Sequence, residues 1–278
     1  MARISTYGLD NSITIEDLIA GTDGDPGMGM ATKNFSMGDL AEFVMKYVED
    51  NSSCCGGNTP TTPVVVKYGY LYNWYTADDS RNIANTGWSV PIIDNQKTLS
   101  DFLGGNTAAG GKMKETGLTY WLTPNTGATN TSGFNGRGGG TRIAETGVFD
   151  RTKDFMQYWA QGFNASGGYV SVLKHDFATY TAYSGTTWYS YAKATGGAIR
   201  LVKDTTTLTN GQTGTYTGND GKVYRTICIG TQEWLADNLL ETKYRDLSAV
   251  PEVTDNTTWA GLTTGARCSY DNDPNNAL

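Results

Sequence analysis

The stretch "GKVYRTICIGTQEWLADNLLETKY" (residues 221–244) shows how most of this chain is built. A short run of strand-forming residues ends at a glycine, and a segment with apolar residues at helical spacing follows, which predicts a helix over residues 231–240. These apolar residues are Trp234, Leu235, Leu239 and Leu240. Similar short β-type runs broken by Gly-rich turns continue from about residue 64 to the end of the chain. We therefore expect an α+β fold for this region.

A second helix is expected around "DNQKTLSDFLGG" (residues 94–105). Asp94 can cap its beginning, and the pair Gly104-Gly105 can end it. The residues expected to face inward are Leu99, Phe102 and Leu103.

Composition narrows the function classes. The chain has 278 residues, of which 35 are Gly, and seven Trp and seventeen Tyr can fill a core. The net charge is −7 and no basic stripe occurs, so nucleic-acid binding is not expected. No apolar run is long enough to span a membrane, and residues 1–10 lack the apolar region of a signal peptide. We therefore expect synthesis in a cytoplasm, without membrane insertion.

The cysteines and the histidine do not form a metal-binding pattern. The four cysteines contain no CxxC pair, and His175 is the single histidine, so neither a zinc site nor another cofactor is expected. No GxSxG or HExxH motif occurs either, so no catalytic residue is assigned. We expect reduced, structural thiols at Cys54, Cys55, Cys228 and Cys268.

Two further motifs have a structural and a functional interpretation. "NGRGGGTR" (135–142) is Gly-rich but lacks the lysine of a phosphate-binding loop, so a tight loop is expected. "DNDPN" (271–275) has acidic and amide residues at calcium-loop spacing, but it lacks the glycine and the closing Glu of an EF-hand. We expect a polar turn there, with calcium binding as the alternative.

Residues 1–50 are predicted to form an attachment or oligomerisation segment that ends in a short helix. In "SMGDLAEFVMKYVEDN" (36–51), Ser36 can serve as the N-cap. The apolar face of this helix consists of Leu40, Phe43, Val44, Tyr47 and Val48. Because so short a helix is marginal alone, the face should bind a partner or two further copies of itself, as a trimer. A Gly/Pro/Thr-rich linker (51–66) then leads into one domain (67–278).

Residues 67–278 resemble the Fibrobacter succinogenes major paralogous domain, a bacterial and phage family, and this implies a C-type-lectin-like fold. The similar segments are "YGYLYNWYTA" (68–77), "GWSVP" (87–91), "LSDFLGG" (99–105), "AGGKMKETG" (109–117), "YWLTPNTGATNTSGFNGRGGGTR" (120–142), "AIRLVKD" (198–204), "GKVYRTICIGTQEWLADNLLETKY" (221–244) and "AVPEVTDNTTWAGLTTGARCSYDND" (249–273).

The order of these segments differs from that of the family. There the "IGTQEWLADNL" type of segment opens the domain, the "DND" turn leads directly into "YGYLYNWY", and the "IRLVKD" strand closes it. Here the closing strand (198–204) precedes the opening strand (222–229), which predicts a circular permutation with a new connection at about 205–219. The two strands should then pair, and residues 270–278 should end beside residues 67–72. Strand exchange between subunits is the alternative.

The beginning of the chain, "ARISTYGLDNSITIEDLIAGTDGD" (2–25), is similar to attachment segments of fibre and appendage proteins in phages that infect Bacteroidetes. The two resemblances together imply a virion structural protein of the head or tail. Its N-terminal segment would bind a capsid or tail protein, and its lectin-like domain would attach to a host surface or glycan or decorate the capsid. A bacterial surface adhesin is the alternative.

An enzyme of the formylglycine-generating type, which shares the general fold, is a remote alternative. That chemistry needs a reactive cysteine pair. Cys268 matches a common cysteine of the family, but Leu201 stands where its companion would be expected. We therefore expect no enzymatic activity.

The stretch "HDFATYTAYSGTTWYSYAKATGG" (175–197) matches the family poorly and is rich in aromatic residues. In C-type-lectin-like folds this part of the chain supplies an exposed, ligand-facing surface. Aromatic rings among small polar residues suit such a surface, although packing against the domain's own sheet is an equally good interpretation. The residues expected to contact a ligand are Tyr180, Tyr183, Trp188, Tyr189 and Tyr191.

Overall fold

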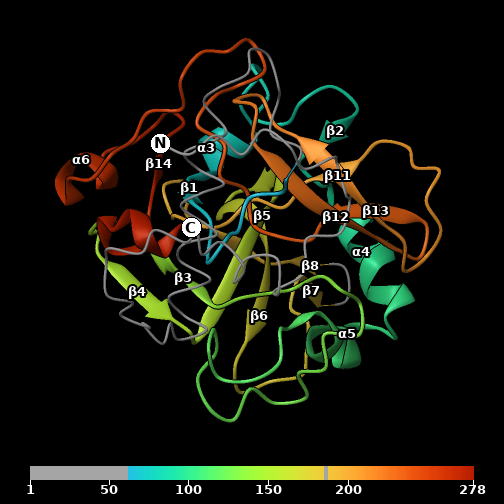
Figure 1. Ribbon diagram of the computed structural model, residues 1–278. Coiled ribbons are helices and arrows are strands. Elements are labelled where there is room, and N and C mark those ends of the chain that lie inside the picture. Colours follow the sequence, from blue (N-terminus) through green and yellow to red (C-terminus); the bar gives the residue numbers. More distant parts are fainter. Residues whose placement is uncertain (1–61, 185–186) are drawn as a thin grey trace, which may run out of the picture. The chain divides into compact units, whose positions relative to one another are not determined.

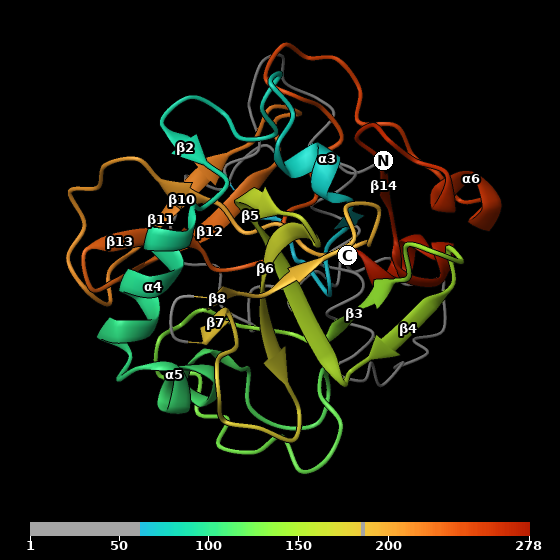
Figure 2. The same ribbon diagram turned by 180° about the vertical axis from the view of Figure 1, so that it is seen from behind.

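A computed structural model describes residues 62–184 and 187–278, with the side chains of residues 183–188 outside the description. Within this part of the chain, strands form two five-stranded sheets and two small two-stranded sheets, and the helices are few and short (Figures 1 and 2). The expected α+β class is therefore confirmed. The helix expected at residues 36–51 lies outside the described residues.

One five-stranded sheet has the order β4-β3-β5-β6-β9. Its strands are β3 (Gly139–Arg142), β4 (Phe149–Thr152), β5 (Phe155–Asn164), β6 (Gly167–Lys174) and β9 (Ser190–Tyr191). The long hairpin of β5 and β6 forms its centre, and β3 runs parallel to β5. Side chains alternate between the two faces of this hairpin. Trp159 and its neighbour Val170 pack into one core cluster, whereas Met156 and its neighbour Leu173 pack into another. The hairpin therefore forms a wall between two buried cores.

The other five-stranded sheet has the order β11-β12-β13-β10-β2. Its strands are β2 (Trp88–Ser89), β10 (Val202–Lys203), β11 (Thr213–Thr217), β12 (Val223–Ile229) and β13 (Gln232–Leu235). The helix predicted over residues 231–240 is wrong, because β13 occupies its first half. Gly230, with φ of +64°, turns the chain so that β13 pairs antiparallel with β12. Tertiary pairing thus overrides the helical spacing of the apolar residues.

Among the described residues, the α-helices are α3 (Trp74–Ala77), α4 (Ile93–Phe102), α5 (Asn106–Met113) and α6 (Asn256–Ala260). Helix α4 is the one predicted around residues 94–105, and the end at Gly104-Gly105 is confirmed. Two details differ: the N-cap is Ile92 rather than Asp94, and Phe102 is 53% exposed rather than buried. The side chain of Asn95 supplies the cap by accepting a hydrogen bond from the Ile92 N–H. None of the described helices is long and apolar enough to cross a membrane.

The C-terminal residues lie beside the segment that begins near residue 67, as expected (Figures 1 and 2). Strand β1 (Leu71–Tyr72) pairs with β14 (Arg267–Cys268), and the Lys67 N–H donates to the Ala277 carbonyl at 3.2 Å. The expected pairing of the opening and closing strands is wrong, because β13 lies between β12 and β10 and pairs with both. The connection at residues 205–219 contributes β11, which pairs with the other edge of β12.

A buried lysine holds several loops near α5. Lys114 is 0% exposed, and its ammonium donates to the carbonyls of Thr126, Lys174 and Phe177 at 2.8–2.9 Å. The Lys114 ammonium thereby supplies hydrogen-bond donors to backbone carbonyls of separate segments, which would otherwise be buried without a hydrogen-bond partner.

Candidate functional site

A shallow cleft opens beside the aromatic stretch, at the end of the sheet that contains β3, β4 and β5. Its volume is about 270 Å³. The residues that line it are Thr141, Ile143, Ala144, Glu145, Asp150, Arg151, Phe155, Gln157, Tyr191, Ala192 and Thr195. They come from the β3–β4 hairpin, from the first half of β5 and from the segment at the end of β9. Three stretches of the chain therefore meet at this cleft.

The floor of the cleft is a closed hydrogen-bond network. The Gln157 side-chain amide donates to the Thr141 hydroxyl and to the Gly196 carbonyl, both at 3.0 Å. The Thr141 hydroxyl in turn donates to the same carbonyl at 2.9 Å. Gln157 is 2% exposed and Thr141 8%, so these bonds form away from bulk water. The side-chain donors of Gln157 and Thr141 are therefore used within the floor itself.

Charged side chains form one wall. Asp150 and Arg151, both exposed, follow each other on β4, and Glu145 is exposed on the turn before it. Arg151 has φ of +65°, which is unusual for a residue other than glycine and re-aims its side chain relative to a regular strand. Its guanidinium carbon lies 5.3 Å from the centre of the Phe155 ring, and its Nε lies 3.7 Å from Asp150 Oδ2. This local conformation brings the Arg151 guanidinium and the Asp150 carboxylate to the same edge of the cleft.

An aromatic side chain forms the opposite wall. Tyr191 is 38% exposed, and its ring meets the buried Phe155 ring edge-to-face at 6.4 Å between centroids. Burial raises the pKa of Tyr191, and the charge of Arg151 opposes that rise. Tyr189 precedes it on the same edge and is 46% exposed, but it does not line the cleft. Tyr189 and Tyr191 thus give this edge an exposed aromatic surface.

The other aromatic residues proposed from the sequence are not all available to a ligand. Tyr180 is 1% exposed, and its hydroxyl bonds to the hydroxyls of Tyr158 at 2.7 Å and Ser171 at 2.8 Å. The expectation that Tyr180 faces a ligand is corrected, because its ring packs in the core. The side chains of Tyr183 and Trp188 lie outside the description, as do residues 40–48.

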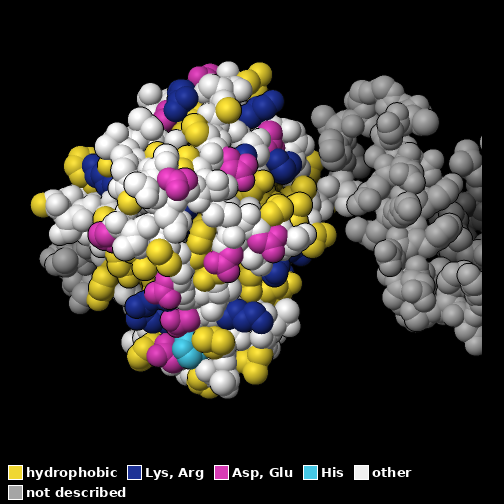
Figure 3. Space-filling view, turned by 90° about the vertical axis from the view of Figure 1, so that its left-hand side faces the viewer, with side chains coloured by type: hydrophobic (Ala, Val, Ile, Leu, Met, Phe, Trp, Pro, Cys, Tyr) yellow, Lys and Arg dark blue, Asp and Glu magenta, His cyan; other side chains and the backbone are white. Residues whose placement is uncertain are grey.

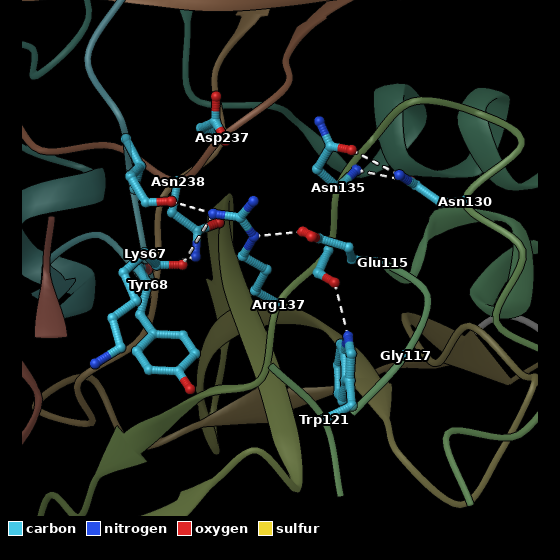
Figure 4. Close-up of polar contacts among 12 residues, drawn as sticks. Lys67, Tyr68, Glu115, Gly117, Trp121, Asn130, Asn135, Arg137, Asp237 and Asn238 are labelled. Atoms are coloured by element: carbon cyan, nitrogen blue, oxygen red, sulfur yellow. Dashed lines mark hydrogen bonds and ion pairs between the residues drawn. The ribbon is translucent and has the colours of Figure 1, made fainter. Parts of the chain in front are cut away.

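The Gly-rich segment 135–142 uses its cations to hold loops together. Arg137 pairs with Glu115 and donates to the Val66 carbonyl, next to Lys67 (Figure 4). Arg142 is fully buried and donates to backbone carbonyls of two other loops. Neither guanidinium is free to face a phosphate. The segment is therefore structural, in agreement with its missing phosphate-binding lysine, but the tight loop expected over 135–142 is wrong for its second half, which forms strand β3 (Gly139–Arg142).

The remaining polar motifs also have structural partners. The side chain of Asp273 accepts hydrogen bonds from both the backbone N–H and the side chain of Asn275, each at 2.9 Å, as expected of a polar turn. The His175 ring contacts the Thr123 carbonyl at 2.9 Å, and its Nε2 lies 3.4 Å from Asp154. In the described part of the chain, no three His, Cys, Asp or Glu residues are placed to bind a metal ion.

Sequence reasoning identified Tyr191 but missed Glu145, Asp150, Arg151 and Phe155. These residues lie in a segment with no recognisable motif, and the left-handed backbone at Arg151 has no sequence signal. Only the meeting of β4, β5 and β9 brings them together.

Comparison with known proteins finds a family model that matches more than half of the chain. The model is described as the Fibrobacter succinogenes major domain, and it matches residues 30–203. The match ends at Lys203, the last residue of β10. No curated protein and no solved structure matches the chain.

Proposed function

Because the chain belongs to the Fibrobacter succinogenes major domain family, we propose that residues 67–278 form a C-type-lectin-like domain in circularly permuted order. The neighbouring positions of Lys67 and Ala277 support this proposal, since the chain could continue there with little rearrangement.

A rearranged protein tests the permutation. Residues 67–278 are re-joined from Leu278 to Lys67 through a short Gly/Ser linker, and the chain is opened at the exposed turn between Asn210 and Gly211. The rearranged chain should fold as a monomer with a melting temperature near that of residues 67–278 in their natural order. Failure to fold, while the parent segment folds, would contradict the proposal. A monomer that appears only after re-joining would favour strand exchange instead.

The domain is proposed to act as the exposed part of a phage virion structural protein that attaches to a host-surface glycan or protein. The observation that carries this proposal is the exposed aromatic pair Tyr189 and Tyr191 beside a polar cleft. Rigid rings among small polar residues give contact area at low cost in side-chain entropy. Residues 1–50 are proposed to anchor the protein to a capsid or tail protein, and residues 51–66 to link the anchor to the domain.

Two experiments test this function. Deleting residues 1–50 should leave a soluble, folded domain that no longer enters purified particles, and normal incorporation would refute the anchor. The double change Trp188→Ala, Tyr189→Ala should reduce attachment to host cells at an unchanged melting temperature. Loss of a buried interface aromatic often costs about 2 kcal/mol, on the order of thirtyfold in affinity. A fall of many degrees in melting temperature would instead mean that these residues pack the domain itself.

The two alternatives have less support. A catalytic cysteine pair would require a reactive thiol, but Cys268 is buried and burial raises the pKa of its thiol to about 12. Cys228 is also buried, and burial again raises its pKa. A bacterial surface adhesin would present the same aromatic edge, and the presence or absence of the protein in purified particles distinguishes that alternative.

A further inference from the structure

We propose that the outward face of the β11–β12 hairpin binds an acidic segment of a partner protein through Arg225 and a row of threonine hydroxyls. The row consists of Thr213, Thr215 and Thr217 on β11. None of these residues lines the cleft or belongs to the aromatic edge, so the inference goes beyond the proposed attachment function and does not rest on it.

The strand register places the arginine and the threonines on one face. Thr215 lies opposite Arg225, and alternation along the strand puts Thr213 and Thr217 on the same side of the sheet as Thr215. The intervening Tyr216 points into the core and is 2% exposed, whereas all three threonines are exposed. No hydrogen bond joins any of the three hydroxyls to another residue that the structure describes. The face therefore presents hydroxyl groups that a ligand can use.

Arg225 keeps an open donor while its orientation is fixed. Its Nε and Nη2 donate to the two carboxylate oxygens of Asp237 at 2.8 and 2.7 Å. The Asp237 side chain is 3% exposed, whereas that of Arg225 is 49% exposed. The Nη1 atom of Arg225 makes no hydrogen bond to the described part of the chain. A carboxylate can therefore bind at this nitrogen at little cost in side-chain freedom.

The cations around Arg225 outnumber the acidic groups. Arg200 is buried, and Arg137 is held by Glu115 and by backbone carbonyls. Burial lowers the pKa of Arg200 to about 9, and the charge of Asp237 opposes this fall. The charges of Arg137 and Arg225 contribute to the fall, so the three guanidinium groups lie near one another. Asp237 and Glu115 are the acidic groups that act on Arg225, so three cations share two carboxylates and one positive charge is uncompensated.

An acidic side chain complements this face. Its carboxylate would supply the missing negative charge and accept a hydrogen bond from Arg225, and the threonine hydroxyls can donate to it as well. Alternate residues of a strand are about 7 Å apart, so an extended partner segment can follow the row with its own alternate side chains. The whole chain has a net charge of −7, and acidic and basic side chains are interspersed on the face that carries α6 and β4 (Figure 3). Because the net charge repels anions at long range, local contacts must hold the partner, which disfavours a polyanion such as nucleic acid.

Titration of the full-length protein with hexaglutamate at low ionic strength tests the inference. NMR signals of the arginine Nε–H groups, in protein with isotope-labelled arginine, report where the peptide binds. Hexaglutamate should shift the Arg225 signal in a saturable way, and hexaglutamine should not. Arg225→Gln should lower the affinity, measured by calorimetry, about tenfold. The matched control is Arg81→Gln, because Arg81 also pairs with an aspartate through Nε and Nη2 and its side chain is 40% exposed.

A second variant leaves the ion pair of Arg225 intact. Thr215→Val removes an exposed hydroxyl and should weaken binding about threefold, whereas Thr207→Val, at an exposed threonine outside the row, should not. The inference is overturned if the Arg225 signal does not shift, if inorganic phosphate binds more tightly than hexaglutamate, or if neither Arg225→Gln nor Thr215→Val weakens binding beyond its control. Self-association of the wild type that Arg225→Gln abolishes would make this face an interface between copies of the chain, and would overturn the inference of a separate partner.

Discussion

Glu241 should make the folded domain less stable as the pH rises from about 5 to 7, and replacing it with Gln should remove this dependence. The Glu241 side chain is 0% exposed and accepts hydrogen bonds from the Tyr224 hydroxyl at 2.8 Å and from the Asp220 backbone N–H at 3.0 Å. Burial, followed by the negative charge of Asp220, raises the pKa of Glu241 to about 7. Both effects oppose ionisation of the carboxyl group in the native state.

The direction and the size of this pH dependence follow from the numbers of protons that the native and the unfolded states bind at Glu241. The ordinary pKa of a Glu side chain is 4.5, so between pH 4.5 and 7 the native state binds more protons at this site than the unfolded state does. The contribution of Glu241 is fully favourable below its unfolded pKa and is lost as the pH rises through its folded pKa. A shift of this size corresponds to about 3 kcal/mol in the free energy of unfolding. The pKa of Asp220 is lowered, so the pH dependence that Asp220 itself gives to the unfolding free energy occurs at more acidic pH, outside this window.

Urea denaturation at several pH values across this window measures the effect. The difference in unfolding free energy between the wild type and Glu241→Gln should change by about 2.4 kcal/mol from pH 5 to pH 7.5, with the variant relatively more stable at the higher pH. Glu252→Gln is the matched control, because its side chain is 50% exposed. A difference that stays constant with pH, or that changes in the opposite direction, would refute the reasoning.

Three further predictions concern the core. Lys114→Met should lower the unfolding free energy by roughly 3 kcal/mol, since several buried carbonyls lose their donor, and chemical denaturation measures this. Gly168→Ala should cost about 2 kcal/mol or more, because a Cβ there would lie 2.1 Å from the Trp74 ring, whereas Gly261→Ala, with its nearest contact at 3.7 Å, should cost much less. Cys268 should resist alkylation at neutral pH in the native protein but react in denaturant, as mass spectrometry of labelled peptides can show. Rapid native labelling would contradict its burial.

Several features of the fold follow from local sequence. Glycine pairs and short β-type runs predicted the α+β class and the end of α4, because glycine conformations and side-chain periodicity act over a few residues. The order of the family-like segments predicted that residues 270–278 lie beside residues 67–72. That expectation is confirmed by the hydrogen bonds that the N–H groups of Lys67 and Gly69 donate to the Ala277 carbonyl.

Other features were decided only by the tertiary structure. Residues 231–240 have helical spacing, but the turn at Gly230 and pairing with β12 make their first half a strand. Tyr180 looks like its exposed neighbours in sequence, yet a buried hydroxyl network draws it into the core. The cleft exists because β4, β5 and β9 meet and because Arg151 has a left-handed backbone, neither of which leaves a local pattern. Local sequence can report which residues prefer a turn or a buried face, but it does not state which distant segment will bury that face, and this pairing determines both the core and the candidate site.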